Sequence, residues 1–347
     1  MKYLNKIKTD NGFKFSQYSN QTILSTSFGV LTKHLLQEEI ENKEKITQYL
    51  LSTRNSEGYF IDPNYKYHEH PEHNSSYVIP QFTFFTLSAL DVLGVKNLEL
   101  LFLKEFNSEK LQEELHKSLE KNFWATSNQL MFLMYFLTYK TKYLEAAGCQ
   151  EYIEIIFQFL NKNQNIENGF WGNELTTNSI YAKAYGAAHI YLFYDYYKKE
   201  IPFTDKIIDN CLKMHSKNGL IQTLEGGACE DYDIIEIYFR CLKQTDYRRE
   251  EILDQLHLMK KILLRDKKGD NSFSYKTYSK NKIYKVFDNN VKTQKYKYSS
   301  WDYMETPYYL SDAWGTFFRH LSLKLINNIL EGKTDYNSAI LPSWGYI

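Results

Sequence analysis

The apolar positions of the chain fall into two kinds of helical segment. Segments of the first kind carry one apolar stripe and run into a polar stretch and a turn where Gly or Asn stands beside an aromatic residue. Copies of this unit lie at residues 46–60, 155–172, 207–220 and 259–273. A helix with a single apolar stripe covers a core from the outside. We therefore expect these segments to form outer helices.

Segments of the second kind are apolar on nearly all faces, which is typical of buried helices. They follow the outer segments, and the first four begin roughly fifty residues apart, a period that indicates a repeat architecture. Their ranges are 77–93, 127–139, 179–197, 229–242 and 311–326. The alternation predicts an all-α fold in which an inner ring of helices is wrapped by an outer ring. This is an α/α toroid, formed as a single domain over residues 1–347.

An open α-solenoid is the structural alternative, although its inner helices are usually less completely apolar and its terminal repeats are polar caps. Residues 274–306 break the repeat, because they are rich in Tyr, Lys, Ser and Asn and lack helical periodicity. We expect a long loop there, lying across one face of the ring, and long loops in compact domains are often functional. No run of strand length shows convincing period-two alternation.

Charge and cysteine usage narrow the function classes. Lys plus Arg equals Asp plus Glu at 42 each, so the chain lacks the basic footprint of a nucleic-acid binder. No apolar run is long enough to cross a bilayer, and the first residues contain no apolar export segment. None of the four cysteines forms a CxxC pair, so we expect free thiols, a cytoplasmic location, and neither a bound metal nor a cofactor.

Aromatic residues are unusually frequent, with 30 Tyr and 22 Phe, while the chain has only 6 Pro. Aromatic rings supply large, stiff apolar surface and suit the lining of a cavity. A drift of AT-rich coding sequence towards Tyr, Phe, Asn, Lys and Ile explains the same numbers. The composition is therefore compatible with a cavity and does not require one.

The unit FLxxxQxxxNGFWG at residues 159–172 resembles the repeat of the terpenoid cyclase and protein prenyltransferase β-subunit superfamily. Proteins of that superfamily are α/α toroids with a central aromatic-lined cavity. The repeat pattern resembles theirs over residues 46–326. The stretch GGACEDYD at residues 226–233 is similar to the start of an inner helix that bears active-site residues in that superfamily.

The chain also departs from the superfamily. Class II cyclases carry DxDD, whereas Asp231 and Asp233 form only DxD, and those cyclases usually need a second helical domain. Prenyltransferase β-subunits bind zinc through Asp, Cys and a distant His. Cys229 and Asp231 echo two of these ligands in reversed order, but Trp314 and Gly315 stand where the His is wanted. Sugar-processing enzymes use α/α toroids too, so the fold does not select the chemistry.

Three acids at the start of an inner helix are the leading catalytic candidates: Glu230, Asp231 and Asp233. Carboxylates crowded at a cavity mouth raise one another's pKa and can keep one of them protonated as a general acid. The alternative is structural, because acids are favoured at helix N-termini by the macrodipole.

Histidines form a second group. His68, His70 and His73 lie within six residues and are compatible with a metal or an anionic substrate, but a polar surface loop is the favoured interpretation. If one of them is functional, we favour His73, which is nearest the inner helix. His189 follows small residues in an apolar inner helix. It either approaches the ring axis or is a hydrogen-bonded core histidine.

The remaining candidates are expected to contact substrate. Asn128 is a polar residue near the start of an inner helix, and Trp171 either lines the cavity or locks a turn. Arg319 stands among apolar residues, so it needs a buried partner: a phosphate or carboxylate of a substrate, or Asp312 or Glu305. The full set of substrate-binding candidates is His73, Asn128, Trp171, His189, Cys229, Trp301, Asp302, Trp314 and Arg319.

These features suggest an enzyme acting on an isoprenoid-like or diphosphate-bearing substrate, a small lipid-like molecule. Carboxylates would supply a proton, aromatic faces would stabilise a developing cation, and Arg319 or a histidine would bind a polar head. A glycan-active hydrolase or lyase is the alternative, since paired carboxylates and stacked rings serve sugars as well. A non-catalytic binding or assembly protein with a protein partner is the third possibility.

Overall fold

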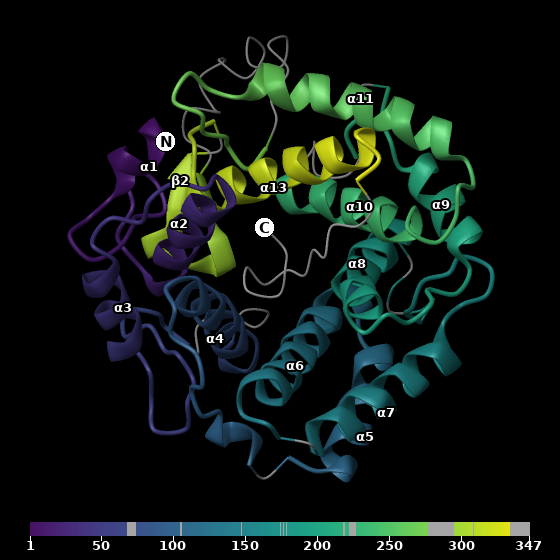
Figure 1. Cartoon of the computed structure of the whole chain (residues 1–347), viewed down its shortest axis with the longest axis horizontal. Helices are drawn as coiled ribbons and strands as arrows, with labels where there is room; N and C mark the ends of the chain where they lie inside the picture. Colours follow the sequence, from purple (N-terminus) through teal and green to yellow (C-terminus); the bar gives the residue numbers. More distant parts are fainter. Residues whose placement is uncertain are drawn as a thin grey trace.

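A computed structural model describes residues 1–333 except 68–73, 105, 147, 174, 176, 178, 218, 222–226, 277–294 and 308. The described chain is mainly helical, which confirms the all-α prediction (Figure 1). In this described part, no helix is long and apolar enough to cross a bilayer.

Six helices of the described chain form an inner set. They are α2 (Ile23–Leu35), α4 (Ser75–Val92), α6 (Phe123–Tyr143), α8 (Ile180–Tyr196), α10 (Ala228–Cys241) and α13 (Ala313–Leu330). Each of them contacts the next in chain order, and α13 contacts α2 (Figure 1). Since α10 is buried at every position except Cys229, these helices make up most of the core.

A second set of helices packs against the outside of the first. Its members are α3 (Lys43–Ser52), α5 (Ser108–Glu120), α7 (Gly148–Asn163), α9 (Thr204–Lys213) and α11 (Arg249–Asp266). They contact α4, α6, α10 and α13, and they bury one face only: α9, for example, buries Ile207, Ile208 and Cys211. The short helices α1 (Lys2–Ile7) and η1 (Leu101–Leu103) complete this layer.

The segments expected to be buried helices correspond to α4, α6, α8, α10 and α13, whereas the sequence pattern missed α2. This helix contains four Ser and Thr residues in 13 positions, so it is not apolar on all faces. Two of its hydroxyls are satisfied within the helix, since Ser27 donates to the carbonyl of Ile23 at 2.8 Å and Thr32 donates to that of Phe28 at 2.7 Å, while Ser25 donates to the carbonyl of Phe13 at 2.7 Å. Such bonds allow a polar sequence to be buried.

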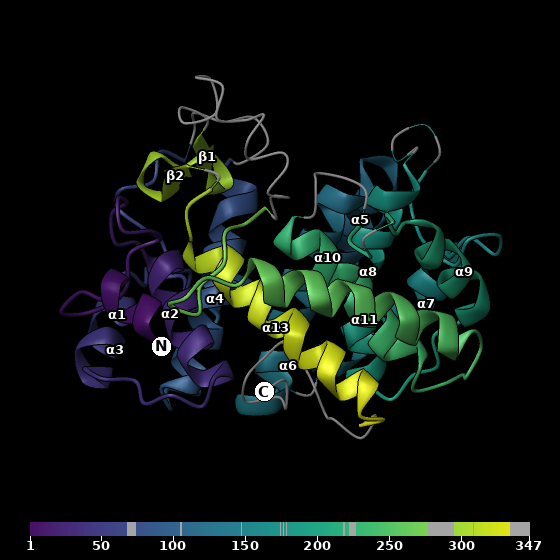
Figure 2. The ribbon, with the colours of Figure 1, turned by 90° about the horizontal axis from the view of Figure 1, so that it is seen from above.

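Part of the expected 274–306 loop has regular structure, which corrects the prediction of an uninterrupted loop. Strands β1 (Lys295–Lys297) and β2 (Glu305–Pro307) pair antiparallel, with η3 (Tyr298–Ser300) and η4 (Asp302–Met304) between them. Three-residue strands are too short to show periodicity. Figure 2 shows the pair at one end of the inner helices. Residues 277–294 of the expected loop lie outside the described residues.

The approach of α8 to α6 is set by a glycine. A Cβ atom at Gly186 would lie 2.6 Å from Cδ1 of Phe123 and 3.2 Å from its backbone oxygen. Phe123 is fully buried at the first turn of α6, so it has little room to move. Gly186 therefore permits the two helices to pack at their observed separation.

Replacing Gly186 by Ala should lower the free energy of unfolding by about 1–3 kcal/mol, because overpacking outweighs the higher helix propensity of Ala. Gly148→Ala is the matched control, since nothing lies within 4 Å of a Cβ atom at that helical position. Urea denaturation of both variants measures the difference. Equal stability of the two variants would show that Phe123 can move aside without lowering the free energy of unfolding.

Candidate functional site

A cavity of about 590 Å³ lies among the inner helices, and all six of them contribute to its wall. Ten of the 22 residues that line it are aromatic. These ten are Tyr77, Phe84, Phe85, Trp124, Phe132, Tyr232, Tyr298, Trp314, Phe317 and Phe318. The cavity also contains a few polar groups, which makes it the natural place to look for chemistry.

Asp233 provides a carboxyl group to this wall from the second turn of α10. Its side chain is buried, the residue being 4% exposed, and no described residue forms a hydrogen bond with it. Burial raises the pKa of Asp233 well above its ordinary value, and the nearby Glu230, Glu236 and Asp231 raise it further. Burial therefore favours the protonated, neutral form of this carboxyl group, which faces an apolar space.

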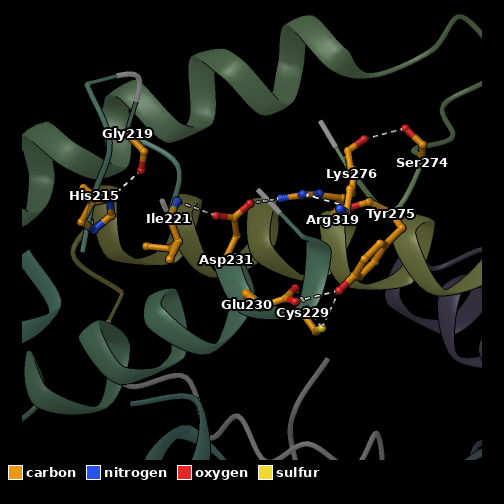
Figure 3. Close-up of polar contacts among 10 residues, drawn as sticks. All are labelled: His215, Gly219, Ile221, Cys229, Glu230, Asp231, Ser274, Tyr275, Lys276 and Arg319. Atoms are coloured by element: carbon orange, nitrogen blue, oxygen red, sulfur yellow. Dashed lines mark hydrogen bonds and ion pairs between the residues drawn. The ribbon is translucent and has the colours of Figure 1, made fainter. Parts of the chain in front are cut away.

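Asp231 is directed away from the cavity and has a different environment. Its carboxylate forms an ion pair with the Arg319 guanidinium on α13 and accepts a hydrogen bond from the Ile221 backbone N–H at 2.9 Å (Figure 3). Both side chains of the ion pair are completely buried. Arg319 thus has an internal partner, and that partner is neither Asp312 nor Glu305.

The carboxyl group of Glu230 accepts hydrogen bonds from Tyr275 and from Cys229. The Tyr275 hydroxyl donates to Oε1 of Glu230 at 2.7 Å, and the Cys229 thiol donates to Oε2 at 3.1 Å (Figure 3). Burial raises the pKa of Glu230 and raises that of Cys229 well above its ordinary value. Cys229 lines the cavity, but as a protonated thiol it is a poor nucleophile.

The segment around Tyr275 is held against the start of α13. The backbone N–H of Tyr275 donates to the Asp312 carboxyl group at 3.0 Å, and the Tyr275 carbonyl accepts from Nη2 of Arg319 at 3.2 Å. Asp312 also caps α13 by accepting from the Gly315 N–H at 2.6 Å. A Cβ atom at Gly315 would lie 2.6 Å from the Tyr275 nitrogen, so only Gly allows this approach.

Three further candidates line the cavity: Asn128, His189 and Trp314. His189 Nδ1 lies 2.9 Å from the Ser127 hydroxyl, and burial lowers the pKa of the imidazole to about 4. The ring is therefore neutral at neutral pH. Asn128 donates from Nδ2 to the Trp124 carbonyl at 3.1 Å.

Three candidates lie elsewhere. Trp171 is completely buried between helices and donates to the Leu160 carbonyl at 2.8 Å, which is the turn-locking role. Trp301 is buried against Phe82, with ring centroids 5.6 Å apart. Asp302 is exposed and forms an ion pair with Lys297. None of the three is among the residues lining the cavity.

His68, His70 and His73 lie outside the described residues. Within the part of the chain that is described, no three His, Cys, Asp or Glu side chains gather in a way that would hold a metal ion.

Sequence reasoning missed the polar end of the cavity. Gln81 on α4 donates to the Tyr298 hydroxyl at 3.1 Å and accepts from the Ser299 hydroxyl at 2.9 Å. All three residues line the cavity. Tyr298 and Ser299 belong to the aperiodic segment, whose abundance of aromatic residues was the available signal.

The chain matches no known protein family, no curated protein and no solved structure.

The separate environments of the acids predict opposite effects of two isosteric changes. Asp231→Asn removes one partner of a buried ion pair and should lower the free energy of unfolding by about 3–5 kcal/mol. Asp233→Asn removes no ion pair or hydrogen bond among the described residues and should leave stability nearly unchanged. Urea denaturation of the two variants at pH 7 measures both effects, and a larger loss in Asp233→Asn would mean that its carboxyl is ionised and paired.

Asp312 should give the protein a distinctive pH dependence. Burial raises its pKa from 3.8 to about 7 in the folded state, despite the hydrogen bonds from Gly315 and Tyr275. The folded state therefore binds the proton more tightly than the unfolded chain. Protonation of Asp312 therefore adds to the free energy of unfolding. The added stability is complete below a pH of about 4 and is lost as the pH rises through about 7, at up to about 1.4 kcal/mol per pH unit.

Asp312→Asn keeps an acceptor oxygen for the helix cap and removes the titration. Subtracting the unfolding free energies of the variant from those of the parent, measured from pH 4 to pH 8, cancels the groups common to both. We expect a falling difference over that interval. A flat difference would place the pKa of Asp312 at its ordinary value.

Proposed function

We propose that this chain is an α/α-toroid enzyme that binds an isoprenoid-like molecule in the cavity and begins its reaction by protonating a carbon–carbon double bond from Asp233. The observation that carries the proposal is the buried carboxyl group of Asp233, which faces an aromatic cavity, has no hydrogen-bond partner among the described residues and has a raised pKa. A toroid is supported by the contacts of the inner helices, which run from α2 to α13 and return to α2.

Protonation of an alkene needs an acid that is still protonated at working pH and a site that tolerates a carbocation. The raised pKa of Asp233 meets the first need. Once the proton has left, the Asp233 carboxylate and the new cation are opposite charges in a medium of low dielectric, so each offsets the cost of burying the other. Faces of Tyr232, Trp314 and Phe318 add cation–π stabilisation.

The proposed step balances without a co-reactant. The π electrons of the substrate form a new C–H bond with the Asp233 proton, the O–H bond breaks, and a carbocation remains. A second double bond of the substrate can then attack this cation and close a ring. Loss of a proton from a neighbouring carbon restores a double bond, so the overall reaction is an isomerisation.

The cavity favours a neutral isoprenoid over one that bears a diphosphate. None of the described residues lining it is Lys or Arg, and Arg319 is already paired with Asp231. A glycan-active role is less well supported, because glycoside hydrolysis usually needs two carboxyl groups flanking one bond. Among the described lining residues, Asp233 alone supplies a carboxyl group.

The test is conversion of acyclic isoprenoid alcohols and hydrocarbons of graded length, followed by gas chromatography and mass spectrometry. Asp233→Asn should lower turnover by roughly 10²–10⁴-fold, the usual contribution of a general acid. Binding, followed through quenching of the cavity tryptophans Trp124 and Trp314, should change little because the substitution is isosteric.

Asp302→Asn is the matched control, since Asp302 is exposed and is not among the residues that line the cavity. It should retain the activity of the parent. Full activity in Asp233→Asn, or no conversion of any isoprenoid by the parent, would contradict the proposal.

A further inference from the structure

We infer that His189 is the base that ends the reaction by accepting a proton from the carbocation at Nε2. The inference rests on the proposed function and assigns a second catalytic residue to the same cavity. Acid and base then stand on neighbouring inner helices, since α10 carries Asp233, α8 carries His189, and these helices contact each other. A substrate in the cavity touches both walls.

The tautomer of His189 follows from the hydrogen bonds of Ser127. The Ser127 hydroxyl has one proton and lies 2.9 Å from the Trp124 carbonyl and 2.9 Å from Nδ1 of His189. A carbonyl only accepts, so the hydroxyl donates to Trp124, as serines in helices commonly do to a carbonyl one turn earlier. Nδ1 must then carry its own proton and donate to the hydroxyl oxygen.

This arrangement leaves Nε2 with a lone pair. No described residue forms a hydrogen bond with Nε2. Since Nδ1 is bonded to Ser127, Nε2 is the ring nitrogen of His189 that is available to a molecule in the cavity. An aprotic ring nitrogen in an otherwise apolar wall is suited to accept a proton from a bound molecule. Gly186 holds the geometry in place, because it lets α8 approach Phe123 on the helix that carries Ser127.

The charge of His189 also fits the role. Burial lowers its pKa to about 4, so the ring is neutral and does not repel a carbocation. A weak base suffices, because a carbocation is a far stronger acid than an imidazolium. Burial raises the pKa of Asp233, whereas it lowers that of His189. Two titratable groups in one site whose pKa values are shifted in opposite directions are typical of a catalytic acid and base.

The proton transfer is balanced. A C–H bond next to the cationic carbon breaks, its electrons form a double bond, and the proton passes to Nε2. The enzyme is left with an Asp233 carboxylate and a His189 imidazolium, and exchange with solvent after product release returns the proton from one to the other. No oxidant, reductant or second substrate is consumed.

The first experiment reads the tautomer directly and needs no substrate. Long-range ¹⁵N–¹H correlation spectra of the uniformly labelled protein should show His189 as the neutral Nδ1–H form down to about pH 5. Ser127→Ala should shift His189 towards the Nε2–H form. Ser88→Ala should not, because Ser88 lines the cavity on α4 and donates to the Phe84 carbonyl. A protonated Nε2 in the parent protein would overturn the inference.

The second experiment uses whichever isoprenoid the parent converts. In His189→Phe the substrate should still be consumed, but the cation should be quenched by water or by a different deprotonation, so alcohols or alternative alkenes replace the parent product. His189→Gln offers a smaller polar replacement if the Phe variant fails to fold, as judged by its thermal transition. Asp233→Asn should instead slow consumption of the substrate by roughly 10²–10⁴-fold.

The outcomes separate the two proposals. Conversion by the parent, with an unchanged product profile and rate in both His189 variants, overturns the role of His189 and leaves Asp233 as the acid. Conversion of no isoprenoid by the parent overturns the proposed function and the role of His189 with it.

Discussion

The buried ion pair between Asp231 and Arg319 is the interaction on which the site depends. It joins α10 to α13, and both side chains are completely withdrawn from solvent. Two charges in such an environment are stable only when their remaining hydrogen-bonding groups are satisfied. The Ile221 N–H and the Tyr275 carbonyl meet part of this need, so the ion pair also ties two connecting segments to the helices.

The orientation of α10 follows from this pair. Successive residues of an α-helix are about 100° apart, so a helix that directs Asp231 towards α13 directs Asp233 to a different side. That side is the cavity wall, while Glu230 meets the Tyr275 hydroxyl. A single cluster of acids is thereby divided into a structural ion pair, a hydrogen-bonded carboxyl group, and a carboxyl group that has no hydrogen-bond partner in the described part of the chain. Only the last of these is placed to act on a ligand.

Much of the fold could be read from the sequence because burial leaves a local pattern. Helices α4 and α8 are apolar on nearly every face, and this is visible without knowing their neighbours. Helix α2 was missed because its Ser27 and Thr32 hydroxyls are satisfied by backbone carbonyls one turn earlier, which an apolar periodicity does not reveal.

The site was less predictable, since it depends on partners that are distant in the chain. Asp231 and Asp233 could be proposed from their crowding at a helix start, but Arg319 is 88 residues from its partner. Nothing in the spacing distinguishes the acid that pairs from the acid that remains free. Tyr275 and Tyr298 lie in a segment without periodicity, so their approach to Glu230 and Gln81 required the tertiary structure.

The central claim is that a neutral carboxylic acid stands in an aromatic cavity at physiological pH. The most direct test is an infrared difference spectrum between the parent protein and Asp233→Asn at pH 7. A carboxylic-acid C=O stretching band present in the parent and lost in the variant is the predicted result. If the variant instead loses the bands of an ionised carboxylate, Asp233 is charged in the folded protein and cannot be the proton donor.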